Sequence, residues 1–181
     1  MIDSLDSWVE LPEERFKTYR NWRTPSGYLC GTYASSVLLA YYQDYINEEI
    51  LPTNLREKES SDNQALIAAL QPMLQPIDMP TVPPQISFGL NRFLKKYQVN
   101  ARTRFTTTGA WQRATKRISQ GKPVMIGILR VLGSTYGNHW VVAYGYMENS
   151  RGERFYKIHD NWGNYNKIIL ARWANGTISF P

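Results

Sequence analysis

The sequence predicts an α+β domain in which helices come first and an antiparallel β-sheet follows. Apolar residues recur at helical spacing between Cys30 and Ile118. Past Gly121 they form short runs and alternating stretches typical of strands. A turn of hairpin type, residues 149–152, separates two of these later stretches.

The first predicted helix begins at Cys30, directly after the turn-rich stretch 23–27. Its apolar residues are spaced at i, i+4, i+7, i+8, i+11 and i+15, which places them on one helix face. They are Cys30, Ala34, Val37, Leu38, Tyr41 and Tyr45. We therefore expect a long, central, half-buried helix that carries the cysteine in its first turn.

Three shorter helices are predicted before residue 121. The first spans 66–74 with Asp62 as its N-cap, and the second spans 86–97 after a proline-rich connector. The last spans 111–118, with Thr108 as its cap. Residues 99–107, between them, alternate like an exposed strand, and the region 45–85 is expected to shape a substrate groove.

The remaining chain reads as short strands. The pattern predicts strands over 123–131, 139–146, 154–160, 166–173 and 177–180. Hairpin turns are predicted at 149–152 and at Asn175-Gly176. Because no internal repeat or inter-domain linker is visible, residues 1–181 are expected to form a single domain.

Composition excludes several classes of protein. With 43% hydrophobic and 20% charged residues, the chain is globular rather than disordered. The longest apolar run, Val124–Leu129, has about six residues, whereas a membrane-spanning helix needs about 20. The N-terminus lacks the features of a secretory signal, so we expect either a cytoplasmic protein or the mature form of an exported one.

The net charge of +6 favours anionic partners, and an anionic cell-wall polymer is one partner that it allows. Specific nucleic-acid binding is not expected, because the Lys and Arg residues are scattered without interleaved aromatics. We interpret these Lys and Arg residues as ordinary solvent-exposed charges on the surface of the protein. A phosphate-binding glycine-rich loop of the GxxxxGK type does not occur, so nucleotide hydrolysis has no support.

The single cysteine, Cys30, excludes an intrachain disulfide and a multi-thiolate zinc site. A metal site built from Cys30, His139, His159 and Asp160 is disfavoured, because no short-spaced pair of ligands occurs. No cofactor is expected. The cysteine is therefore either a small core residue or a nucleophile.

The position of Cys30 favours the nucleophile. The positive end of a helix dipole favours the thiolate, which needs a base within hydrogen-bond reach. His139 opens an apolar strand at a loop edge, where a base could reach a cleft. The predicted hairpin returns the chain beside His139 at Asp160 or, with a register shift of one, at Asn161.

Three segments resemble the papain-like cysteine peptidases, and among them the bacterial group that cleaves bacteriocin leader peptides after double glycine. They are Tyr28–Gly31 with the following small-residue helix, Gly137–Tyr146 and Ile158–Gly163. The resemblance implies a papain-like fold and a thiol hydrolase that acts on a peptide or protein substrate. It implies that Cys30 is the nucleophile and that His139 is the general base and then acid.

The resemblance also implies that Asp160 orients the imidazole and that Trp162 packs over the pair and limits water. One position departs from the family pattern. The family places a glutamine six residues before the cysteine to stabilise the oxyanion, and this chain has Thr24 there. A hydroxyl, the Asn21 amide or the Trp22 indole would have to substitute.

Four functional hypotheses follow. The first is a peptide or amide hydrolase that works through a Cys-His-Asp triad and an acyl-enzyme. The second is a peptidoglycan or isopeptide amidase on the same fold. The third is a catalytically weak or inactive binding or regulatory module, which Thr24 motivates, and the fourth is a polyanion-binding protein.

Overall fold

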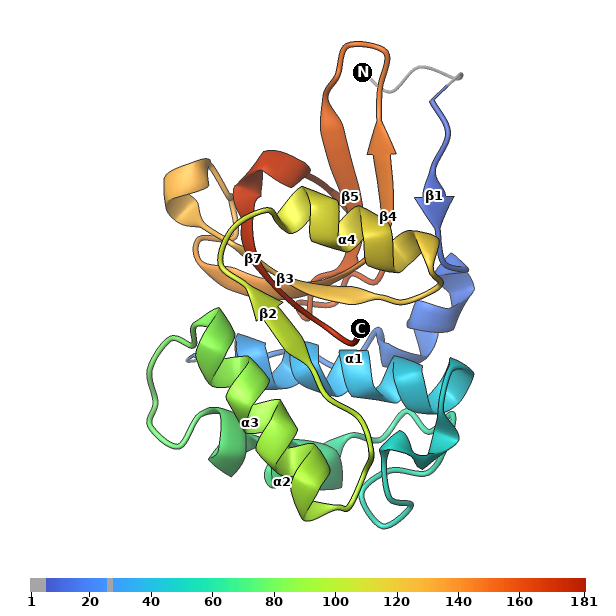
Figure 1. Cartoon of the computed structure of the whole chain (residues 1–181), viewed down its shortest axis with the longest axis vertical. Helices are drawn as coiled ribbons and strands as arrows, with labels where there is room; N and C mark the ends of the chain where they lie inside the picture. Colours follow the sequence, from blue (N-terminus) through green and yellow to red (C-terminus); the bar gives the residue numbers. More distant parts are fainter. Residues whose placement is uncertain (1–5, 26–27) are drawn as a thin grey trace.

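A computed structural model describes residues 6–25 and 28–181. It has two parts, a group of helices and a twisted sheet with one further helix on its far side (Figure 1). Ser26 and Gly27, which belong to the predicted turn before the first helix, lie outside the described residues.

The helical part is built around α1 (Cys30–Tyr45), which lies between the sheet and the pair α2 (Gln64–Leu74) and α3 (Pro83–Lys96) (Figure 1). Almost all of α1 after its first residue is buried, because it contacts α2 on one side and the sheet on the other. The sequence pattern was therefore right about a long central helix, but α1 is more fully enclosed than the half-buried helix expected.

The sheet has the order β2-β7-β3-β4-β5-β6, and β1 pairs with β4 off this path. Every pairing is antiparallel. The strands are β1 (Val9–Glu10), β2 (Arg104–Thr106), β3 (Val124–Ile128), β4 (His139–Glu148), β5 (Arg154–His159), β6 (Lys167–Leu170) and β7 (Ala174–Ser179).

Two cores lie on opposite faces of this sheet. Met125, Trp140 and Val142 point to the helical part, whereas Ile126 and Val141 point to α4 (Ala110–Ser119). The alternation along β3 and β4 follows from the two-residue period of a strand. Because both faces are covered, the central strands are apolar on both faces, and β3 is buried throughout.

The predicted α+β order is confirmed, as is the hairpin at 149–152 between β4 and β5. The second predicted hairpin is wrong, because Asn175 and Gly176 lie inside β7. A Cβ on Gly176 would lie 2.5 Å from Pro83 and 3.0 Å from the carbonyl oxygen of Thr106, so this glycine permits a close approach rather than a turn.

Capping was also predicted incorrectly at α4. The residue before the helix is Gly109, with φ of 68°, and no side chain caps it. Two short N-terminal elements were not predicted at all, namely β1 and the 3₁₀ segment Glu13–Tyr19. Both are too short to show a periodic signal.

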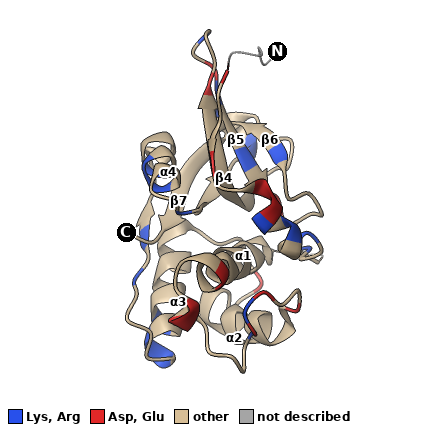
Figure 2. Cartoon of the chain, turned by 90° about the vertical axis from the view of Figure 1, so that its right-hand side faces the viewer, with Lys and Arg blue, Asp and Glu red and all other residues tan. Residues whose placement is uncertain are grey.

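Charged residues are spread over both parts of the molecule. Figure 2 shows Lys and Arg on α4, β5, β6 and the end of α3 rather than on one face. This distribution agrees with the interpretation of the Lys and Arg residues as ordinary solvent-exposed charges. Within residues 6–25 and 28–181, no helix is long and apolar enough to cross a bilayer.

Candidate active site

Two adjoining hollows meet where α1 begins and β4 begins. Both are lined by Tyr28, Cys30, Asn138 and His139. The larger, of about 670 Å³, extends along residues 80–83, 127–130 and 175–176. The smaller, of about 550 Å³, extends toward Thr24 and Trp162. The predicted nucleophile and base therefore share one cleft, although they are 109 residues apart in sequence.

Cys30 is the first residue of α1 and is partly buried. Burial raises the pKa of its thiol, and this effect outweighs the backbone N–H groups of Trp140, Gly31 and Cys30, which lower it. Removal of water from the sulfur therefore opposes the thiolate that the helix start was expected to favour. Burial in this position favours the neutral thiol.

His139 is buried and is held through one ring nitrogen. Its Nε2 donates a hydrogen bond to the backbone carbonyl of Asp160 at 2.6 Å. Because a carbonyl only accepts, this bond selects the tautomer protonated on Nε2 and leaves Nδ1 as the proton acceptor. Burial lowers the pKa of His139, more than contact with Asp160 raises it, so the ring is neutral and able to act as a base near pH 7.

Two aromatic rings enclose the imidazole. Tyr136 stacks on His139 with centroids 5.6 Å apart and planes 7° apart. Trp162 lies against His139 at 4.7 Å and against Tyr136 at 5.0 Å. With its Nε2 bonded and its faces covered, the imidazole has little freedom to rotate.

No hydrogen bond joins the Asp160 carboxylate to His139, in contrast to the contact expected from its orienting role; the bond to the ring comes from the Asp160 carbonyl. Its Oδ1 accepts from the backbone N–H groups of Trp162 and Asn164, at 2.8 and 3.0 Å. Its Oδ2 accepts from the Tyr136 hydroxyl at 2.9 Å and from the Asn164 amide at 2.7 Å. The carboxylate thus organises the turn after β5, and the carbonyl of the same residue holds the imidazole.

The side chains of Asn161 and His159 form hydrogen bonds to backbone carbonyls beside the site. Asn161 has φ of 59°, and its amide donates to the Trp140 carbonyl at 2.9 Å. His159 is fully buried and bonds to the Tyr19 carbonyl at 2.8 Å. The structure therefore offers no contact through which Asn161 would orient His139 in place of Asp160.

Thr24 lines the smaller hollow, and its backbone N–H donates to the Asn161 carbonyl at 2.7 Å. Its hydroxyl is buried and has no hydrogen-bond partner among the described residues. The Trp22 indole donates to the Ser61 carbonyl, and Asn21 lines neither hollow. Of the three residues expected to substitute for the missing glutamine, only Thr24 lines a hollow of the cleft, and its hydroxyl oxygen is buried there.

Comparison with known proteins identifies the family. The profile of the Peptidase_C39 like family matches residues 14–175, a span that contains Cys30, His139 and Asp160. The chain belongs to this C39-like family. No curated protein matches the sequence.

The fold is also found in a solved structure. The chain is similar to a Bacillus anthracis protein assigned as a C39-like peptidase, with 14% identity and a TM-score of 0.53 over 85% of this chain and 88% of that one. It also matches the proform of Amb a 11, a cysteine protease and ragweed pollen allergen, with 13% identity and a TM-score of 0.43 over 99% of this chain and 65% of that one. The predicted papain-like fold is confirmed.

Two features of this C39-like site were not predicted. Tyr136 was not assigned a role, although it lies three residues before His139. Gln75 is buried at the end of α2, and its amide donates to the carbonyls of Tyr28 and Met79, both at 2.7 Å. It ties the residues before Cys30 to the connector, and only the tertiary structure reveals this.

The connector between α2 and α3 forms one wall of the cleft, as expected for part of region 45–85. Its Thr81 accepts a hydrogen bond from the Trp140 indole through its carbonyl, at 3.2 Å. A Cβ on Gly31 would lie 2.6 Å from the Thr81 hydroxyl oxygen. Glycine after the cysteine therefore lets the connector approach the start of α1.

In the C39-like site, no cluster of three or more His, Cys, Asp or Glu side chains suited to a metal ion is found among the described residues.

Alkylation of Cys30 is expected to rise with pH through a midpoint above the ordinary cysteine value of about 8.5. The reason is that burial raises the pKa of the thiol, and only the thiolate reacts with iodoacetamide. His139→Ala should leave this midpoint nearly unchanged, because the neutral ring does not stabilise the thiolate. A rate that is already level below pH 6 and that loses its plateau in His139→Ala would contradict this prediction.

Tyr136→Phe is expected to lower the free energy of unfolding by about 1 kcal/mol. The buried Asp160 carboxylate would lose the hydroxyl donor at 2.9 Å, while the ring stack on His139 would remain. Urea denaturation followed by fluorescence measures this difference. Tyr33→Phe is the matched control, because no hydrogen bond from the Tyr33 hydroxyl is found in the described structure, and an equal loss in both variants would contradict the prediction.

Proposed function

We propose that this protein is a thiol hydrolase that cleaves a peptide or amide bond through an acyl-enzyme. The observation that carries the proposal is the shared cleft, in which Cys30 at the start of α1 and His139 at the start of β4 line the same two hollows. Membership of a peptidase-like family supports a peptide as the substrate class.

In the proposed reaction, the Cys30 sulfur attacks the carbonyl carbon while its proton passes to Nδ1 of His139. The carbon–nitrogen bond then breaks, and the same proton goes to the leaving amine. Water attacks the thioester, gives a proton to Nδ1, and the acid product leaves as the thiol is restored. This route starts from a neutral thiol and a neutral imidazole, which matches the directions of both pKa shifts.

The oxyanion would be stabilised by two donors in this proposal. One is the backbone N–H of Cys30, which as a first-turn group has no partner within the helix. The other is the hydroxyl of Thr24, which is buried without a partner on a residue that lines the smaller hollow and would turn toward the oxyanion when substrate binds. Because a shorter side chain replaces the family glutamine, we expect Thr24→Val to reduce kcat by about 10²-fold.

Asp160 and Trp162 act on the imidazole in different ways. The Asp160 carbonyl fixes the tautomer, while its carboxylate holds the turn that presents this carbonyl. Trp162, which is 49% exposed, covers the ring on the solvent side and restricts access of water. The residues of the expected triad are thus retained in the proposal, but Asp160 contributes its carbonyl to the hydrogen bond.

The test is hydrolysis of a library of internally quenched peptides by the wild type, Cys30→Ala and Cys30→Ser. Wild-type cleavage that is absent in both variants, with a thioester adduct on Cys30 detected by mass spectrometry after quenching in acid, would support the proposal. Cleavage that persists in Cys30→Ala would overturn it.

A binding module without catalysis is the second candidate, favoured by the raised pKa of Cys30 and by the missing glutamine. The two candidates differ in whether a bound peptide is cleaved. If peptides bind to wild type and Cys30→Ala with equal affinity and neither protein cleaves them, the binding module is correct.

A further inference from the structure

Among the Asp, Glu, Lys and Arg side chains, only arginines line the walls of the cleft, so the charge there is positive. Arg23 lines the smaller hollow and Arg130 lines the larger, so one arginine lies on each side of the Cys30 and His139 pair. Neither hollow is lined by an Asp or Glu among the described residues. The Asp160 carboxylate, beside the site, is fully buried and already accepts four hydrogen bonds.

Neither arginine has an acidic partner in the part of the chain that the structure describes. All ion pairs found there involve Arg56, Lys58, Arg154 and Lys157. The Arg23 guanidinium lies against Gly163, where a Cβ would be 2.9 Å from its Nε. Gly163 has φ of 104°, so glycine at this position allows both the turn and the approach of the arginine.

Arg130 is placed by its backbone. Its N–H donates to the Asn138 side chain at 2.9 Å, and it begins the 3₁₀ turn Arg130–Leu132 after β3. The guanidinium is left without a hydrogen-bond or ion-pair partner among the described residues. A fixed backbone with an unpaired cation at the wall of a cleft is suited to an anionic group on a ligand.

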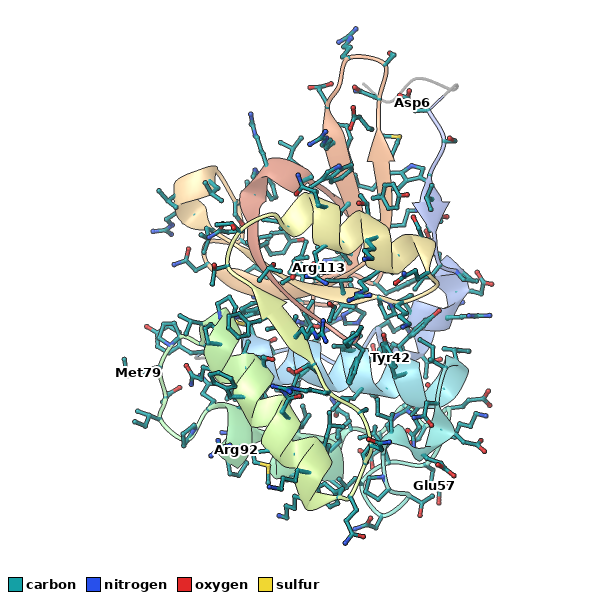
Figure 3. All side chains as sticks on the ribbon, viewed as in Figure 1. Asp6, Tyr42, Glu57, Met79, Arg92 and Arg113 are labelled. Atoms are coloured by element: carbon teal, nitrogen blue, oxygen red, sulfur yellow. The ribbon has the colours of Figure 1, made fainter. Side chains whose placement is uncertain are left out.

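Exposed apolar side chains stand at or next to the lining of the larger hollow. Val82 lines it and is 55% exposed, while Met79 and Val131, at 58% and 84%, are the chain neighbours of the lining residues Pro80 and Arg130. Figure 3 shows Met79 on the connector loop at the edge of the molecule. Apolar side chains beside an unpaired cation fit a peptide chain better than a uniformly charged polymer, which would leave these side chains uncovered.

We propose that the substrate is a peptide segment with an acidic side chain on each side of the scissile bond, one read by Arg23 and one by Arg130. This proposal rests on the proposed hydrolase function and adds the substrate class. The two arginines are specificity residues that touch substrate remote from the reacting atoms. Asp78 lies on the same connector, next to Met79, and its carboxylate is outside the lining of both hollows.

The experiment uses quenched peptides that differ only at one position on either side of the scissile bond, with Glu, Gln or Lys there. The wild type should cleave the Glu peptides with kcat/KM about threefold to tenfold above the Gln peptides on each side, and this preference should shrink at high salt. Arg130→Gln should remove the preference on one side only, and Arg23→Gln on the other. Arg130→Glu should favour Lys on its side.

Arg151→Gln is the matched control, because Arg151 lies in the turn between β4 and β5, away from the cleft. Binding of the same peptides to Cys30→Ala, followed by fluorescence anisotropy, separates the two proposals. If binding prefers Glu in an Arg-dependent way but wild type cleaves nothing, the specificity stands and the hydrolase function fails. If Glu, Gln and Lys peptides are cleaved or bound equally, the acidic specificity is overturned.

Discussion

Replacing His139 with alanine is expected to lower kcat by about 10²- to 10⁴-fold while the protein stays folded. The imidazole supplies Nδ1 as the acceptor of the Cys30 proton and then as the donor to the leaving amine. Without it, the buried thiol has a raised pKa and no base in reach of the cleft. The loss should lie in kcat more than in KM, because the ring contacts the reacting atoms and not the remote parts of a substrate.

The pH profile of kcat/KM provides a second readout for the same residue. Burial lowers the pKa of His139, so more than half of its rings are in the base form at the pH where an ordinary histidine is half protonated. Wild-type activity should therefore fall with a midpoint below pH 6.5, as His139 becomes protonated. His139→Ala should lack this acid limb in its residual activity.

His159→Gln is the control, since His159 is the only other histidine. It is fully buried against the Tyr19 carbonyl, outside the cleft. It should lower the free energy of unfolding but leave kcat of the folded protein close to wild type. If His159→Gln lost as much kcat as His139→Ala, or if His139→Ala retained full turnover, the role assigned to His139 would be wrong.

The sequence was sufficient to predict where Cys30 and His139 lie, because a helix start and a strand edge are local features. It also predicted that residue 160 returns beside His139, which follows from the β4–β5 hairpin. It could not show which atom of Asp160 would face the ring. That depends on the turn after β5, where Asn161 and Gly163 adopt positive φ and the carboxylate accepts the backbone N–H groups of the turn.

Other features depend on contacts between distant segments. Gln75 reaches the carbonyl of Tyr28, two residues before the start of α1, only because α2 packs beside α1. Asn175-Gly176 has the composition of a turn, yet Gly176 is extended because Pro83 and β2 lie against it. The sequence shows a glycine at position 176. It does not show whether that glycine is needed for a turn or for close packing against another segment.

A buried ion pair should contribute the largest single effect on stability. Arg56 and Asp44 bond at 2.8 Å, with side chains 0% and 1% exposed. Asp44 also accepts from the Tyr19 hydroxyl at 2.6 Å and from the backbone N–H of Glu59 at 2.7 Å. The pair therefore joins α1 to the 3₁₀ segment Glu13–Tyr19 and to the segment between α1 and α2, which carries Arg56 and Glu59.

Asp44→Ala is expected to lower the free energy of unfolding by about 3–5 kcal/mol, since it leaves the Arg56 guanidinium buried without a counter-charge. Two further donors, on Tyr19 and Glu59, would lose their acceptor. Urea denaturation should show a lower midpoint with an unchanged slope. Glu48→Ala is the matched control, because its pair with Lys58 is exposed and should change stability by less than about 1 kcal/mol.

The double variant Asp44→Leu/Arg56→Met decides whether the unpaired charge is the cause. Removing both charges should restore much of the stability lost in Asp44→Ala, because apolar groups of similar size leave no charge to desolvate. The Arg56 guanidinium also donates to Gln43 and to the Ser60 carbonyl, so recovery should be partial. A double variant less stable than Asp44→Ala would instead assign the stability to these additional hydrogen bonds and to the packing of Arg56 against Trp22.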